Sequence, residues 1–245
     1  MKTKEIKVSK FLKMKLNRPH KKLILTTALF FCCLTKGISQ EGDKLGSWYV
    51  YNGFFNFSPK FELFAESQIR TWEPIDNLQS FFIRPFFNLN LNENVQLGIS
   101  QEYHSNWSFS ELASDKVQTE EYRTTLQGIL THKVGRVSLQ HRYRYEFRFL
   151  DESGKQRTRY RLQLGIPISS NEVKKGVWFA TLGNEIMLNT QPKFDVSQNR
   201  AYGMLGYQFS KSTHLQIGYM YISRPVQENL HRLQFFLTQK LRFYD

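Results

Sequence analysis

A period-two alternation of side chains constrains the fold of this chain more than any other feature. It is clearest between residues 136 and 149, where mostly apolar or aromatic residues at odd positions alternate with polar or charged residues at even positions. Successive side chains of a β-strand point to opposite sides, so this pattern predicts a strand with one apolar and one polar face. It recurs in windows separated by turn-rich breaks, which is typical of a β-barrel. We identify eleven windows, at 45–55, 61–71, 78–91, 95–107, 121–131, 136–149, 157–166, 177–189, 199–209, 214–224 and 230–243.

The placement of charges supports a barrel that crosses a membrane. The windows hold 21 charged residues, and within each window all of them lie on the face opposite the more apolar one. A membrane barrel needs this segregation, because charges avoid hydrocarbon and a closed sheet pairs all of its backbone groups. A soluble antiparallel sandwich, such as a periplasmic binding protein, also alternates and is kept as an alternative.

Aromatic residues near the predicted strand ends favour the membrane barrel over the sandwich. Membrane barrels carry girdles of aromatic side chains where lipid meets water. We expect outer-membrane lipid to contact six such residues, namely Trp72, Tyr103, Trp107, Tyr122, Trp178 and Tyr207.

The first 39 residues have the parts of an export signal. A basic stretch ends in Lys21 and Lys22, an apolar run follows over 23–34, and small residues Gly37 and Ser39 come last. This order is typical of a secretory signal peptide. The sequence therefore predicts a signal peptide over residues 1–39 and a single β-barrel over residues 40–245.

The predicted leader accounts for much of the chain's charge and for both of its cysteines. The formal net charge is +13, yet residues 1–39 alone hold ten Lys or Arg and one acidic residue. The basic composition is therefore weak evidence for nucleic-acid binding, and no nucleic-acid partner is expected. Cys32 and Cys33 lie in the leader, so the mature chain is expected to lack disulfides and thiolate sites.

The breaks between windows predict strand number and orientation. Short breaks fall near 58–59, 92–94, 134–135 and 211–212, and longer ones at 73–77, 109–119, 150–155, 190–198 and 225–229. Bacterial barrels have short periplasmic turns, longer external loops and even strand numbers. We therefore expect the longer breaks to face outward and the barrel to have about twelve strands, in the range ten to twelve, with a further strand near 40–45. The break at 167–176 is long where a short one is expected.

The polar face should line the barrel interior and is rich in arginine. Facing guanidinium groups repel one another unless carboxylates, water or an anionic ligand separates them. The face is thus interpreted either as a salt-bridged ladder that fills a narrow barrel or as a pore surface that attracts small anions. The densest basic cluster is Arg142, Arg144, Arg148, Arg157, Arg159 and Arg161, and its expected acidic partners are Glu146, Glu185, Glu102 and Glu121.

Enzyme chemistry has little support in this sequence. The best nucleophile-and-base set for a lipid-acting hydrolase is His104 with Ser105, but adjacent residues of a strand point to opposite faces. There is no metal-ligand spacing of histidines and no phosphate-binding loop. We therefore expect a non-enzymatic protein without cofactor or metal, and keep the lipid-acting hydrolase as an alternative.

Several segments together resemble one family of bacterial proteins of unknown function, the DUF2490 family. They are Asn77-Leu78-Gln79-Ser80, 135–144 with its His-Arg-Tyr-Arg run, Arg159-Tyr160-Arg161-Leu162, Asn184-Glu185-Ile186 and 194–200, and the likeness spans about 45–243. The resemblance implies a barrel in the outer membrane of a Gram-negative bacterium, inserted by the barrel-assembly machinery. It implies no activity and no catalytic residues.

Overall fold

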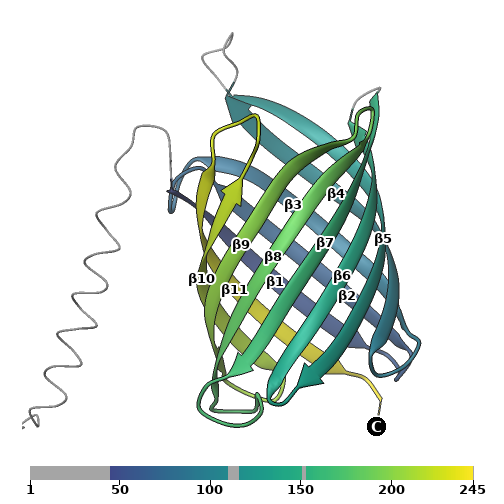
Figure 1. Ribbon diagram of the computed structural model, residues 1–245, viewed down its shortest axis with the longest axis vertical. Coiled ribbons are helices and arrows are strands. Elements are labelled where there is room, and N and C mark those ends of the chain that lie inside the picture. Colours follow the sequence, from purple (N-terminus) through teal and green to yellow (C-terminus); the bar gives the residue numbers. More distant parts are fainter. Residues whose placement is uncertain (1–44, 110–115, 151–152, 245) are drawn as a thin grey trace, which may run out of the picture. The chain divides into compact units, whose positions relative to one another are not determined.

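The computed structural model describes residues 45–109, 116–150 and 153–244, and these residues form an all-β barrel (Figure 1). The predicted signal peptide lies outside the described residues. No helix in the described part of the chain is long and apolar enough to cross a membrane. The strands are β1 (Leu45–Asn56), β2 (Phe61–Thr71), β3 (Leu78–Asn90), β4 (Val95–Phe109), β5 (Lys116–Val134), β6 (Val137–Leu150), β7 (Ser153–Pro167), β8 (Trp178–Gln191), β9 (Asp195–Gln208), β10 (Thr213–Ser223) and β11 (Leu230–Arg242).

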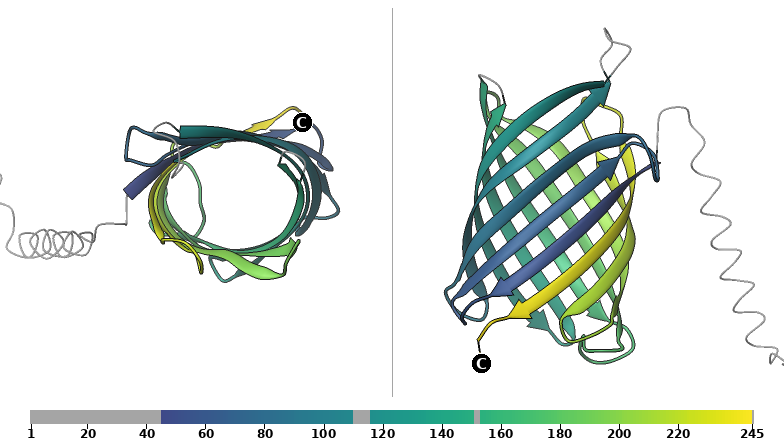
Figure 2. Two further views of the ribbon diagram at one scale, coloured as in Figure 1. Left: turned by 90° about the horizontal axis from the view of Figure 1, so that it is seen from above. Right: turned by 180° about the vertical axis from the view of Figure 1, so that it is seen from behind.

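The described strands form one sheet that closes on itself, as the end-on view in Figure 2 shows. Each strand pairs antiparallel with its neighbours in the sequence, and the ring closes where β1 pairs with β11. A sandwich needs two separate sheets packed face to face. The alternative of a β-sandwich is therefore wrong.

The expectation of twelve strands is also wrong, because eleven strands close the described barrel. β1 and β11 run parallel, in register from Leu45 beside His231 to Asn56 beside Arg242. An odd number of strands in an up-and-down order forces one parallel pair at the closure. Residues 40–44, where a further strand was expected, lie outside the described residues, and β1 and β11 are directly hydrogen-bonded in the described barrel.

The two ends of the barrel are defined by its connections. The upper end in Figure 1 carries the described connections 72–77, 192–194 and 224–229, and the lower end carries 57–60, 91–94, 135–136, 168–177 and 209–212. The loops at the two ends differ less in length than the sequence predicts. The reason is that β5 and β7 extend into the breaks at 109–119 and 150–155.

The long connection at 168–177 lies at the lower end and is tied to the sheet. The amide of Gly176 donates to the carbonyl of Gln208 over 2.7 Å, and the amide of Gln208 donates to the carbonyl of Val177 over 3.1 Å. The φ of Gly176 is 84°, a left-handed conformation that glycine adopts without strain. This pairing to β9 explains why a long segment takes the place of a tight turn.

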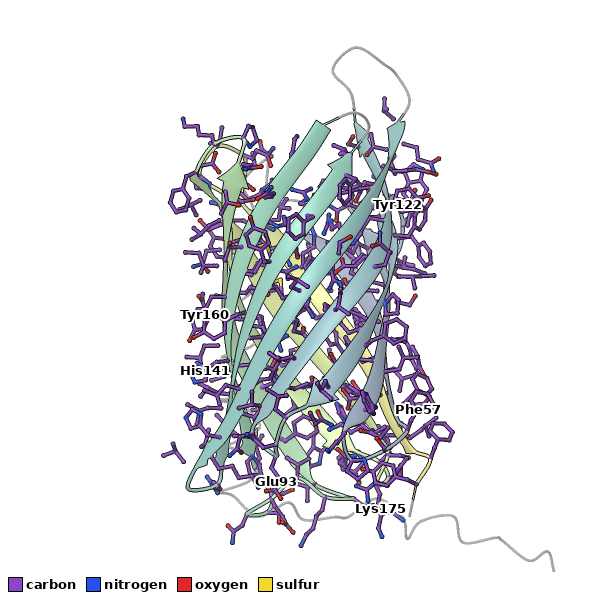
Figure 3. All side chains as sticks on the ribbon, turned by 90° about the vertical axis from the view of Figure 1, so that its right-hand side faces the viewer. Phe57, Glu93, Tyr122, His141, Tyr160 and Lys175 are labelled. Carbon is purple, nitrogen blue, oxygen red and sulfur yellow. The ribbon has the colours of Figure 1, made fainter. Side chains whose placement is uncertain are left out.

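The outer face of the barrel is apolar over all of its strands. Phe87, Ile99 and Leu126 occupy adjacent positions on β3, β4 and β5, and each is about half exposed. Outward polar groups bond one another, as where Nδ1 of His141 lies 2.9 Å from the Tyr160 hydroxyl (Figure 3). Continuous apolar surface of this extent marks contact with an apolar partner and fits the predicted lipid-facing belt.

The inner face is not polar throughout, contrary to expectation. Trp48 and Val50 of β1 pack inside the barrel against Met220 and Ile222 of β10 and Leu230 of β11. We call these five residues the inner apolar cluster. The window at 45–55 contains no charged residue that would distinguish its two faces.

Candidate functional site

A network of buried ion pairs occupies the upper part of the barrel interior. Both carboxylate oxygens of Glu146 are bound, Oε2 by Nη2 of Arg157 at 2.5 Å and Oε1 by Nη1 of Arg159 at 2.6 Å. Arg159 also binds Oε2 of Glu185 through Nη2 at 2.7 Å. Arg142 binds the other oxygen of Glu185 at 2.7 Å. These contacts join the two strands of the predicted basic cluster to β8.

A second branch of the network centres on Glu121. Its two carboxylate oxygens accept hydrogen bonds from Arg123 of the same strand, each over 2.8 Å, and from Arg148 of β6, over 2.5 and 3.1 Å. One carboxylate therefore separates two guanidinium groups, as a salt-bridged ladder requires.

A third branch lies on β2, β3 and β4. Arg84 binds Glu66 at 3.2 Å and Glu102 at 2.9 Å, so it bridges two carboxylates. The ring of His104 lies 2.8 Å from Glu102 and stacks on Phe82. All six predicted arginines and all four predicted acids thus point inward, although Glu102 pairs with Arg84 and His104 instead of with the predicted basic cluster.

Three further arginines point inward without a carboxylate partner among the described residues. Nε of Arg70 donates to Gln68 at 3.0 Å, and its guanidinium lies 3.8 Å from the centre of a Trp48 ring. Arg144 donates to Gln127 at 2.9 Å, and Arg161 donates to Gln140 at 2.5 Å. A buried cation without a counter-ion is costly, and no direct carboxylate contact among the described residues balances the charge of these three groups.

Two connected cavities open this region toward the lower end. The inner cavity, of about 300 Å³, is lined by eight basic side chains and two acidic ones, Glu66 and Glu185. The outer cavity, of about 790 Å³, is bordered by the turns at 91–94 and 209–212. They share five lining residues, Phe54, Gln96, Ile129, Gln140 and Lys240, so they form one recess that deepens from the lower end.

The upper half of the interior is packed. Phe82, Glu121, Glu146, Ile222 and Arg232 are each 2% exposed or less. The inner apolar cluster fills one side and the ion-pair network fills the other. The cation of Arg70 links the two sides by stacking on Trp48, an arrangement that arginine favours.

The described residues do not bring the predicted His104 and Ser105 pair together. His104 points inward and is buried, whereas the Ser105 hydroxyl accepts a hydrogen bond from Gln118 on the opposite face. No group of three His, Cys, Asp or Glu side chains within the described ranges is placed to hold a metal ion.

The predicted interfacial aromatics fall on the outer face with one exception. Tyr103 and Tyr122 pair near the upper end, with ring centres 5.4 Å apart, and Trp178 and Tyr207 pair near the lower end at 4.9 Å. Trp107 lies at an outward position of β4. Trp72 is the exception, and its predicted place on the outer face is wrong. Its ring packs against the inner apolar cluster, with Arg232 5.4 Å from the ring centre.

Fold and site together define the class: a closed β-barrel with an apolar outer face and an ion-paired, arginine-rich interior. The chain belongs to the family described as "Protein of unknown function (DUF2490)", whose model matches residues 45–233. That match confirms the resemblance noted in the sequence. No curated protein and no solved structure matches the chain.

Proposed function

We propose that this chain is a non-enzymatic, integral barrel of the bacterial outer membrane and that its interior forms a narrow channel selective for small anions. The observation that carries the proposal is the charge of the inner cavity, where eight basic side chains face two acidic ones. A cavity of one charge sign with low-dielectric walls concentrates ions of the opposite sign.

The outer face supports the membrane location. The alternating pattern places apolar side chains such as Phe87, Ile99 and Leu126 outward, and aromatic pairs lie toward both ends. In water this surface would be a large exposed apolar patch, whereas in a bilayer it is solvated by lipid. The predicted signal peptide supports export.

A second candidate function is that of a structural barrel that does not conduct. The packed upper half of the interior favours it, because Glu121, Glu146 and Phe82 are almost fully buried there. In that case the recess at the lower end would be blind, and ions would enter it and leave from the same side.

Single-channel recording distinguishes the two candidates. The full chain is purified in detergent, inserted into a planar bilayer, and its reversal potential is measured under a KCl gradient. A channel gives steady openings with a reversal potential on the chloride side of zero, and Arg144→Gln shifts that potential toward zero. Insertion without openings contradicts the channel and favours the structural barrel.

A further inference from the structure

The basic side chains that line the inner cavity differ in whether a carboxylate binds them. Arg84, Arg142 and Arg159 line it, and each binds at least one carboxylate. Arg144 and Arg161 line it too, but they donate to the amide oxygens of Gln127 and Gln140 and bind no carboxylate among the described residues. The cavity wall therefore has two kinds of arginine, one neutralised by the protein and one left to another anion.

Buried guanidinium nitrogens without a hydrogen-bond partner among the described residues occur on both kinds of arginine, Nε of Arg142 and of Arg159 among them. They also include Nη1 of Arg144 and Nε of Arg161 and Arg200, each without a partner among the described residues. Arg144 is 3% exposed and Arg200 is 9% exposed. The nearest carboxylate contact of Arg200 is to Glu185 at 3.6 Å, longer than a good charged hydrogen bond. Buried donors are normally satisfied, so these atoms point to a ligand.

We propose that Arg144, Arg161 and Arg200 form a binding site for one small polyvalent oxyanion, a phosphate, a sulfate or a compact carboxylate. This proposal rests on the anion preference proposed above but does not require conduction. A guanidinium presents a planar fork of donors that matches the oxygens of such ions. Several forks around one cavity favour a multiply charged ion over chloride, which offers a single charge and no oxygen.

The size and position of the cavity suit this ligand. About 300 Å³ holds a small oxyanion with some of its water, since a water molecule occupies about 30 Å³. The ion would enter from the lower end past Lys240, an exposed residue that lines both cavities. Above the cavity the ion-pair network narrows the interior, so the bound ion would rest against Arg84 and Arg159, which line the cavity.

Calorimetry on the purified full chain in detergent tests the site. Sodium sulfate, phosphate and citrate are titrated at constant ionic strength, with chloride as the reference ion. We expect one saturable site for a polyvalent oxyanion, with an affinity at least tenfold above that for chloride. Preference for citrate would identify a carboxylate ligand, and preference for phosphate or sulfate a tetrahedral one.

Matched variants locate the binding. Arg144→Gln and Arg200→Gln should each weaken it at least tenfold. Arg148→Gln is the control, because Arg148 binds Glu121 and lines neither cavity. Lys240→Gln, at an exposed position that tolerates change, should weaken binding about threefold even if the buried variants fail to fold.

Three results would overturn the site: no saturable binding by the unmodified protein, equal weakening by Arg148→Gln and Arg144→Gln, or no effect of any cavity variant. Anion-selective conductance without saturable binding leaves the channel proposal in place and removes the site. Saturable binding without conductance leaves the binding site in place and removes the channel proposal.

Discussion

Arg157 donates two hydrogen bonds to the same oxygen of Glu146, from Nε at 2.8 Å and from Nη2 at 2.5 Å. The pair is buried inside the barrel, and the other oxygen of Glu146 is bound by Arg159. One carboxylate thus neutralises two guanidinium groups on β7. If its negative charge is removed, both buried guanidinium groups lose that carboxylate contact.

Glu146→Gln should therefore destabilise the barrel strongly. Removal of one member of a buried charge network costs about 3 kcal/mol. Here Arg157 would lose its carboxylate partner and Arg159 would keep only Glu185. The free energy of unfolding is measured by denaturant titration of the barrel in lipid vesicles. Glu93→Gln, in an exposed turn, is the control and should change stability by less than about 0.5 kcal/mol. An equally small effect at Glu146 would contradict the paired ladder.

The Leu126→Arg substitution tests whether the outer face of the barrel contacts lipid or water. Leu126 points outward, about half exposed, between Ile99 and Tyr145 on the neighbouring strands. If lipid covers this face, the arginine should lower the free energy of unfolding in vesicles by about 2–4 kcal/mol, whereas Leu126→Met should be tolerated. A fully stable, soluble Leu126→Arg protein would rule out the membrane location.

Cysteine labelling in intact cells tests the proposed orientation. Val226→Cys places a thiol in the exposed connection at the upper end, and Lys175→Cys places one at the lower end (Figure 3). We expect a membrane-impermeant maleimide to label Val226→Cys at once and Lys175→Cys only after the outer membrane is permeabilised. The reverse order would show that the barrel is inserted the other way up, and the unmodified chain controls for its own cysteines.

A cross-link tests the parallel closure. Tyr51 and Leu237 are register partners on β1 and β11, and both occupy outward positions. Partner Cα atoms on paired strands fall within disulfide range, so Tyr51→Cys with Leu237→Cys should form a bond that changes gel mobility without reductant. Tyr51→Cys with Leu215→Cys is the control, because Leu215 lies one strand further away, on β10. Equal cross-linking of both pairs, or of neither, would contradict the closure.

Much of the strand pattern could be predicted because membrane and interior impose opposite demands on alternate residues. The window at 61–71 coincides with β2, and the arginines of 142–161 lie on the face assigned to them. The same rule placed Arg84 and Arg200 inward, on strands far from that cluster in the sequence.

Closure and the individual ion pairs could not be predicted, because both depend on register between distant strands. Glu185 was expected among the partners of the basic cluster, but its contact with Arg142 spans 43 positions of sequence, and Glu102, expected beside the same cluster, binds Arg84 instead. The rule of even strand numbers failed because it is a regularity among known barrels and not a physical requirement. The backbone hydrogen bonds between β1 and β11 can form between parallel as well as antiparallel strands. Trp48 and Val50 were missed because β1 lacks the charges that identify an inward face elsewhere.

The parallel seam has a consequence for how the chain can be rearranged. Leu45 begins β1 at the upper end and Arg242 ends β11 at the lower end. Where strand number is even, the first strand begins on the rim where the last strand ends, and a short linker can join these two ends to give a circular permutant. Here such a linker would have to pass the full height of the sheet, through its filled interior or along its apolar outside. A short linker between β11 and β1 therefore cannot give a circular permutant of this barrel.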